Sequence, residues 1–195
     1  MKAIVVGNAA SVLEENKGKL IDSFDVVIRL NKFVTTGYEV HVGSKTNIYC
    51  SKWLNMKHNI ANVNAYDKVW LPYPKPPNWW TAKGNFKELS EAQHLANIKE
   101  HNLDVSKLTY LAPERAKEME TVFKKAYQPS TGLIALMLAV QELNLYKISY
   151  TGFDNFSTGW YWDVGHNCIK NMQNSILFEK IFLNYLNITY GVTKL

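Results

Sequence analysis

Three polar stretches could carry chemistry, and each stands beside a segment that the sequence predicts to be a buried strand or a helix. The first is Gly7-Asn8-Ala9-Ala10-Ser11, which follows an apolar run. A glycine at this point lets a ligand approach the backbone, and the start of the next helix offers N–H groups to an anion. The later glycines of the GxGxxG dinucleotide fingerprint are absent. A tight strand-to-helix turn therefore explains this stretch as well as a nucleotide site does.

The second stretch, Pro129-Ser130-Thr131-Gly132, precedes a strongly apolar segment that we expect to be helical. Two hydroxyls and an unhindered glycine backbone at a helix N-terminus can hold an anion. The same residues also make an ordinary N-cap, and taken alone they favour that interpretation. No GKS or GKT sequence follows, which excludes a P-loop.

The third stretch, Trp160-Tyr161-Trp162-Asp163-Val164-Gly165-His166, ends on a histidine. Histidine has an unperturbed pKa of about 6.5 and therefore suits general acid–base work. Of the five histidines, His166 stands out because it follows an aromatic loop and a glycine and precedes a long predicted helix. A lone histidine is more often structural, so both interpretations stay open here. The metal-binding patterns DxD, HExxH and HxH are absent, and we expect no metal and no cofactor.

These stretches must be positioned by a single domain, because 195 residues suit one hydrophobic core. We therefore predict one domain over 1–195. Apolar runs of strand length alternate with segments of helical period, which indicates an α/β fold with a mostly parallel sheet. In such a sheet ligands bind at the carboxyl ends of the strands, where the three stretches would meet. We expect strands over 3–7, 25–31, 45–50, 67–72, 108–112, 147–152 and 187–190, and helices over 11–20, 86–101, 113–126, 131–143 and 167–185. A loop rich in proline and tryptophan should span 72–83.

Composition restricts the class of partner. The net charge of +5 comes from scattered basic residues, so no nucleic-acid surface is indicated, whereas an anionic nucleotide-sugar or the anionic face of a membrane is compatible. Two cysteines, Cys50 and Cys168, indicate a fold that does not depend on a disulfide. Met1 leads almost directly into a predicted core strand, and the longest apolar stretch, 133–140, is too short to span a bilayer. We therefore predict a cytoplasmic protein, with peripheral membrane contact compatible with its charge.

Taken together, the three stretches resemble the motifs of glycosyltransferase family 29, the eukaryotic-type sialyltransferases. The long first motif of the family resembles Val6-Gly7-Asn8 followed by the run 21–46, which contains IDSFDVVIRLN, Gly37-Tyr38-Glu39 and VGSKT. The short second motif resembles Pro129-Ser130-Thr131-Gly132, an apolar helix and Thr151-Gly152-Phe153. The last motif of the family centres on a histidine, which His166 matches. The matches lie toward both ends of the chain, so they are jointly more specific than any one of them.

The resemblance implies a Rossmann-like domain of the variant GT-A type, with helices on both sides of the sheet. It also implies an inverting, metal-independent transfer of sialic acid from CMP-sialic acid to a hydroxyl of a glycan or glycolipid. The implied roles are CMP binding for Asn8, Asn31, Ser130, Thr131 and Gly132, general-base catalysis for His166, and leaving-group or acceptor contacts for Trp160 and Tyr161.

Several departures from the family pattern qualify what the resemblance implies. The cysteines of the animal members' disulfide are missing near Ala3 and Leu143, as expected of a short bacterial or viral member. The third-motif histidine of the family falls on Trp160, and an acidic residue after the catalytic histidine falls on Asn171. The alternatives are therefore a CMP-Kdo-dependent transferase and an inactive module that binds CMP or glycans. An NAD-dependent enzyme is disfavoured by the missing glycine fingerprint, and the sequence does not predict the oligomeric state.

Overall fold

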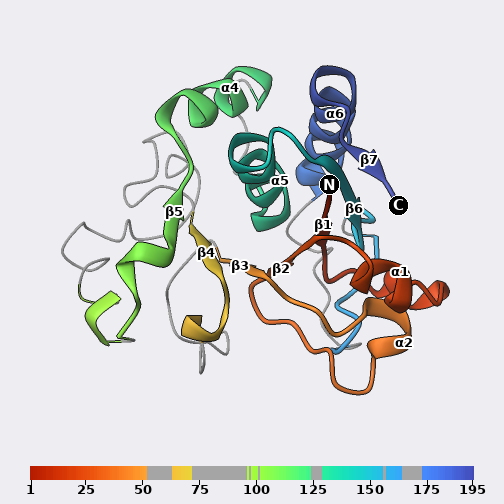
Figure 1. Cartoon of the computed structure of the whole chain (residues 1–195). Coiled ribbons are helices and arrows are strands. Elements are labelled where there is room, and N and C mark those ends of the chain that lie inside the picture. The colour runs from red at the N-terminus through yellow and green to blue at the C-terminus, as the bar shows by residue number, and fades with distance from the viewer. Residues whose placement is uncertain are drawn as a thin grey trace.

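The computed structural model of the chain describes residues 1–51, 63–71, 96, 98–100, 102–123, 129–155, 157–163 and 173–195, with the backbone alone for 173–175. The described residues form a seven-stranded sheet in which every strand pair is parallel (Figure 1). The predicted α/β class with a parallel central sheet is thereby confirmed. The strands are β1 (Lys2–Val6), β2 (Val26–Leu30), β3 (Ile48–Cys50), β4 (Lys68–Leu71), β5 (Leu108–Tyr110), β6 (Lys147–Thr151) and β7 (Thr193–Lys194).

Helices cover both faces of this sheet because its central strands, β1 above all, carry apolar residues on both sides. In β1, Ala3 and Val5 pack into the large core beneath α5, while Ile4 and Val6 join the smaller core on the other face. The α-helices with printed bounds are α1 (Gly18–Asp22), α2 (Glu39–Val42), α4 (Pro113–Phe123), α5 (Thr131–Glu142) and α6 (Gln173–Tyr190). The 3₁₀ turns are η1 (Ala10–Glu14), η2 (Val63–Ala65) and η4 (Val105–Lys107). Among the described helices, none combines the length and the apolar character that crossing a bilayer requires.

The strand order β5-β4-β3-β2-β1-β6-β7 reverses direction at β1. The chain builds outward from β1 through β2 to β5, and then returns through α4 and α5 to place β6 on the other side of β1 (Figure 1). The chain therefore continues from β1 and from β6 to strands on opposite sides of this pair, and the carboxyl end of such a switch point is where open α/β sheets bind ligands. The N-terminus of α5 lies at the same edge, because α5 precedes β6 and runs antiparallel to it.

Two of the predicted elements differ from the structure. The helix expected over 11–20 is divided into η1 and α1, with residues 15–17 between them. Gly18, the first residue of α1, packs directly against α2, since a Cβ on Gly18 would lie 1.8 Å from the carbonyl oxygen of Glu39. The strand predicted over 187–190 is wrong, since these residues form the last turn of α6. Burial of Leu186 in the large core overrides the local strand propensity, and the last strand begins only at Thr193.

Other predicted segments fall partly or wholly outside the described residues. The loop over 72–83 and most of the helix over 86–101 are among them, as are 124–126 and 167–172 of two further predicted helices. The described part of the helix over 113–126 agrees with α4, and the helix over 131–143 agrees with α5.

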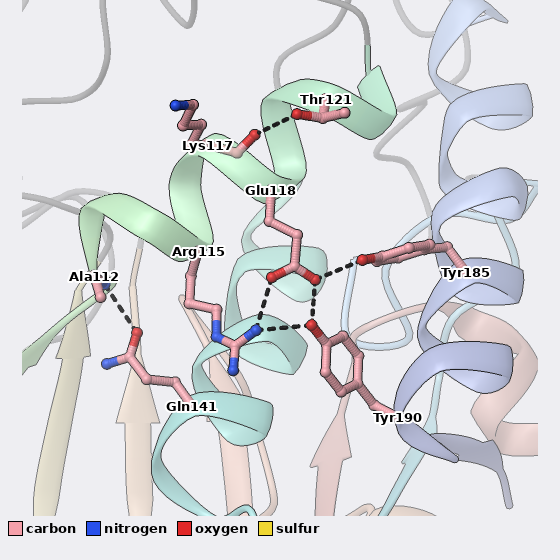
Figure 2. Close-up of polar contacts among 8 residues, drawn as sticks. All are labelled: Ala112, Arg115, Lys117, Glu118, Thr121, Gln141, Tyr185 and Tyr190. Carbon is pink, nitrogen blue, oxygen red and sulfur yellow. Dashed lines mark hydrogen bonds and ion pairs between the residues drawn. The ribbon is translucent and has the colours of Figure 1, made fainter.

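A polar cluster ties α4 to α6 (Figure 2). Glu118 of α4 accepts hydrogen bonds from the hydroxyls of Tyr185, at 2.7 Å, and Tyr190, both on α6. Arg115 donates to the other oxygen of Glu118 at 2.7 Å and to the hydroxyl of Tyr190 at 2.7 Å. Burial works against the charge of Glu118, but the bonds from Tyr190, Tyr185 and Arg115 outweigh it and lower the pKa of the carboxyl. The ionised carboxylate therefore holds the two helices together.

Replacing Glu118 with glutamine should lower the free energy of unfolding at pH 7 by about 1–2 kcal/mol, because charge-assisted hydrogen bonds to partly exposed partners are weakened. Since the folded-state pKa is depressed, the stabilisation is present above the unfolded pKa of about 4.3 and is lost as the pH falls through the folded value. Urea unfolding at pH 7 and at pH 4 should show that the free energies of unfolding of wild type and Glu118→Gln differ less at pH 4 than at pH 7. Glu114→Gln, on the exposed first turn of α4, is the control, and equal effects of the two changes would contradict the assignment.

Candidate active site

The side chain of Asn31 joins the run 21–46 to the second stretch, 100 positions further along the chain. It stands directly after β2, and its backbone adopts a left-handed conformation with φ of 47°. Its Nδ2 donates to Oγ1 of Thr131 at 3.1 Å, and its Oδ1 accepts from the hydroxyl of Ser51 at 3.4 Å. Ser51 follows β3, so the carboxyl ends of two strands and the start of α5 meet at this amide. Asparagine tolerates the left-handed region better than most residues, which suits this position.

Asn8 holds the carboxyl ends of β1 and β2 together. Its Nδ2 donates to the backbone carbonyl oxygens of Leu30, at 3.1 Å, and Lys32, at 2.9 Å. The backbone carbonyl of Asn8 accepts from the N–H of Tyr161 at 3.1 Å. Both amide hydrogens are therefore engaged within the protein. In this structure Asn8 shapes the site by fixing the backbone on either side of Asn31.

The second stretch begins α5 as a helix N-cap. The Oγ of Ser130 accepts from the N–H of Leu133 at 3.2 Å, and Ser130 remains partly exposed. Thr131 is 8% exposed, and Gly132 is buried. A Cβ on Gly132 would lie 2.3 Å from the ring of Phe153, so glycine is required there by packing against the loop after β6. The cap and the close packing together aim the N-terminal end of α5 at Asn31.

Two glycines allow β1 and β6 to approach each other closely where the loops that follow these strands begin. A Cβ on Gly7 would lie 2.2 Å from the carbonyl oxygen of Gly152, whose own φ is 70°. The N–H of Gly7 donates to the carbonyl of Thr151 at 2.8 Å. The backbones therefore touch without a side chain between them, and Asn8 is carried directly to the base of the loop that contains the third stretch.

That loop is fastened to the first stretch along its length. Asp154 accepts from the N–H of Thr158 at 2.9 Å and from its hydroxyl, and the same hydroxyl oxygen accepts from the N–H of Ala10 at 2.9 Å. Trp160 pairs with Ala9 in an isolated antiparallel bridge. The first and third stretches of the sequence therefore lie side by side, as their placement at strand ends predicts.

Tyr161 is a buried anchor in this arrangement. It is 1% exposed, its hydroxyl donates to the carbonyl of Val34 at 2.5 Å and accepts from the N–H of the same residue at 3.1 Å. Burial raises the pKa of Tyr161, which keeps the hydroxyl protonated for this bond. The edge of its ring packs on Tyr38 with centroids 5.1 Å apart. Tyr161 therefore ties the third stretch to the loop after β2.

Much of the run 21–46 also serves internal structure. The guanidinium of Arg29, which is buried in β2, donates to the carbonyl oxygens of Val42, at 2.7 Å, and Lys45, at 3.0 Å, and to the hydroxyl of Thr46 at 3.0 Å. Burial lowers the pKa of Arg29, and the carbonyl dipoles around it stabilise its charge. This web fixes the segment between α2 and β3.

Sequence reasoning missed two residues at this edge, Ser51 and Lys32. Ser51 completes the contacts of Asn31, and the only signal for it was a polar residue directly after a buried strand. Lys32 places its ammonium 4.6 Å from the ring centroid of Trp162. Trp162 stacks on Trp160 with centroids 4.7 Å apart and an interplanar angle of 30°. A lysine two residues beyond a strand has no motif that would have singled it out.

His166 and Asn171 lie outside the described residues, so the structure gives no geometry for the predicted base. Within the described ranges, no three histidine, cysteine, aspartate or glutamate side chains gather as metal ligands would.

The fold and these contacts agree with a comparison against known families. The model of glycosyltransferase family 29 (sialyltransferase) matches residues 1–187, which is nearly the whole chain. The chain belongs to glycosyltransferase family 29. Family membership accounts for the joint presence of the first and second motifs, whose residues Asn31 and Thr131 are hydrogen-bonded here.

Individual family 29 proteins are distant in sequence. The human β-galactoside α-2,6-sialyltransferase 2 is 27% identical over 207 residues, covering 94% of this chain and 38% of that protein. The chicken CMP-N-acetylneuraminate-β-galactosamide-α-2,3-sialyltransferase 1 is 28% identical over 177 residues, covering 83% and 47%. The mouse α-N-acetylgalactosaminide α-2,6-sialyltransferase 1 is 23% identical, covering 80% and 36%. The chain thus spans less than half the length of these three relatives.

Solved structures agree on the fold. Two crystal structures of a mammalian sialyltransferase, one of them in complex with Gal-β-1-3GalNAc-ortho-nitrophenol, superpose with TM-scores of 0.64 and 0.60. Each covers the whole of this chain and 68% of the other, at 18% and 19% identity. This likeness shows that the described residues share the fold of the mammalian sialyltransferase.

Proposed function

We propose that this chain transfers sialic acid from CMP-sialic acid to a hydroxyl of a glycan or glycolipid, with inversion at the anomeric carbon and without a metal. The proposal rests on membership of family 29 together with the arrangement at the carboxyl edge of the sheet. A cytoplasmic location, peripheral membrane contact and one domain over 1–195 stay predictions.

The hydrogen bond between Asn31 and Thr131 is the observation that supports a donor site most directly. It joins the end of β2 to the N-terminus of α5 at the point where the strand order reverses. A helix N-terminus carries a partial positive charge and N–H groups without intrahelical partners, both of which favour a phosphate. The partly exposed Ser130 and Asn31 would contact the CMP moiety, while Thr131 orients the amide of Asn31.

The proposed reaction is a single displacement. The acceptor hydroxyl attacks the anomeric carbon as the bond from that carbon to the phosphate oxygen breaks, and the electron pair of that bond leaves with CMP. His166 accepts the proton of the attacking hydroxyl, a contribution worth about 10²–10⁴-fold in rate. The N-terminus of α5 stabilises the charge that develops on the departing phosphate.

Nucleotide binding tests this function before any acceptor is known. At 100 times its dissociation constant, CMP should add about 2.7 kcal/mol to the stability of the chain, a rise of roughly 5–11 °C in Tm. UDP, GDP and NAD should give much smaller shifts at the same concentration, and EDTA should leave the CMP shift and any turnover unchanged. A thermal shift with NAD but not with CMP would sink the proposal. Turnover that is lost in EDTA and restored by manganese or magnesium would contradict the metal-independent mechanism alone.

An inactive CMP-binding module is the second candidate. It is favoured by Trp160, which is engaged in a backbone bridge and an indole stack where the family places a histidine. Tight CMP binding without turnover of CMP-sialic acid or CMP-Kdo on any acceptor would support it. Turnover of CMP-Kdo without turnover of CMP-sialic acid would leave the proposed mechanism standing and replace the proposed donor.

A further inference from the structure

The ammonium of Lys32 is held beside the proposed donor site by an aromatic platform. It lies 4.6 Å from the ring centroid of Trp162, and that ring stacks on Trp160. The backbone of Lys32 is fixed as well, because its carbonyl accepts from Asn8 at 2.9 Å and the preceding residue is Asn31. The backbone and the ammonium of Lys32 are therefore positioned by residues of the first and third stretches, Asn8 and Trp162.

The charge of Lys32 is not neutralised by any described carboxylate. The ion pairs among the described residues join Lys17 to Glu15 and Arg115 to Glu118. Arg29, the other basic residue near the end of β2, is buried, and its guanidinium donates hydrogen bonds to two carbonyls and a hydroxyl. Lys32 is partly exposed at the same strand end, so its charge remains available to a ligand.

Contact with an indole face replaces part of the water around an ammonium without neutralising it. Lysine is a compact point charge, and it binds phosphate and carboxylate through charge-assisted hydrogen bonds. A cation held in this way matches an anionic ligand better than a neutral one, and it belongs to the residue next to Asn31, whose side chain reaches Thr131 at the start of α5.

We propose that Lys32 binds an anionic group of the nucleotide-sugar donor, its phosphate or the carboxylate of its sugar, and that Trp162 sets the position of the ammonium. This inference rests on the proposed function, because it deepens the same donor site. The two anionic groups share one recognition chemistry, and ligands that carry one, both or neither of them separate the two sources.

Isothermal titration with cytidine, CMP and CMP-sialic acid provides the test, using wild type, Lys32→Met and Lys32→Arg. Methionine keeps most of the length and apolar character of lysine and removes its charge. If Lys32 binds the phosphate, Lys32→Met should weaken CMP about 10- to 100-fold and leave cytidine unchanged. If it binds the sugar carboxylate, only CMP-sialic acid should weaken by that factor. Lys32→Arg should restore much of the affinity in either case, and high salt should reduce the advantage of wild type over Lys32→Met.

Lys147→Met is the matched control, because it removes an equal charge at the start of β6, where the amino-terminal ends of the strands lie and not their carboxyl ends. It should leave all three affinities unchanged. Equal weakening of cytidine and CMP in Lys32→Met would reveal a structural effect and overturn the inference. So would unchanged affinities in Lys32→Met while wild type binds CMP, and that result would leave the proposed function standing. Failure of wild type to bind either CMP or CMP-sialic acid would overturn both.

Discussion

Replacing His166 with alanine should lower turnover at least about 100-fold while leaving the affinity for CMP and the melting temperature nearly unchanged. The reason is that a general base acts on the acceptor hydroxyl and contributes in the transition state, not in donor binding. In wild type, turnover should rise with pH through one pKa on the acidic side, as the imidazole loses its proton. That limb should vanish in the variant.

The contrast with other variants makes this result specific. His41→Ala, which changes a partly exposed histidine of α2, should keep wild-type turnover. Asn31→Ala and Ser130→Ala should weaken CMP binding first, because both side chains lie at the end of β2 and the start of α5. Retention of more than about half of wild-type turnover in His166→Ala, well under 1 kcal/mol in barrier terms, would show that the base lies elsewhere. A large fall in melting temperature would instead assign His166 a packing role.

Replacing Gly7 with alanine should reduce the free energy of unfolding by about 3 kcal/mol, the upper part of the range for forcing an extra methyl group into a packed interior. The new Cβ would lie 2.2 Å from the carbonyl oxygen of Gly152, which is backbone and cannot turn aside. Relief requires β1 and β6 to separate where the N–H of Gly7 bonds Thr151. Asn8 would move with the strand, so affinity for CMP should fall as well.

Gly37→Ala provides the comparison, since its φ is 85° and no other atom lies within 4 Å of the added Cβ. This variant experiences only the conformational cost of the left-handed region, about 1 kcal/mol. Urea unfolding of both variants measures the difference, provided that the dependence on denaturant is unchanged. Equal destabilisation by the two substitutions would mean that β1 and β6 are not as closely apposed as described.

The class of fold could be predicted from the sequence because parallel strands buried on both faces are continuously apolar, as in AIVV. The same argument placed the three polar stretches at one edge, since carboxyl ends of parallel strands converge. Propensity failed over 187–190, because the local preference of β-branched and aromatic residues is weaker than burial of α6 against the core. The division of the predicted helix 11–20 into η1 and α1 was also not predicted, and the close approach of α2 to Gly18 is a contact that no local pattern indicates.

Motif residues could be found from the sequence, but their division of labour could not. Asn8 and Asn31 are the same residue type at corresponding strand ends, yet the amide of Asn8 is engaged by two carbonyls and that of Asn31 reaches Thr131. Gly132 suggested access for a ligand, whereas its missing side chain makes room for Phe153. Such distinctions depend on which atoms meet across about 20 to 100 residues of chain, and no local pattern encodes that meeting.

By itself, then, the sequence determined the layered α/β class, the edge at which the site lies and the family motifs, because periodicity and motif order are local properties of the chain. Only the tertiary structure decided that Asn31 meets Thr131 and Ser51, that Tyr161 is an anchor for Val34, and that Lys32 rests on Trp162. Each of these contacts joins segments separated by one or more strands and loops. Their geometry is set by the packing of β1 against β6 and of α5 against the sheet, which spacing along the chain does not specify.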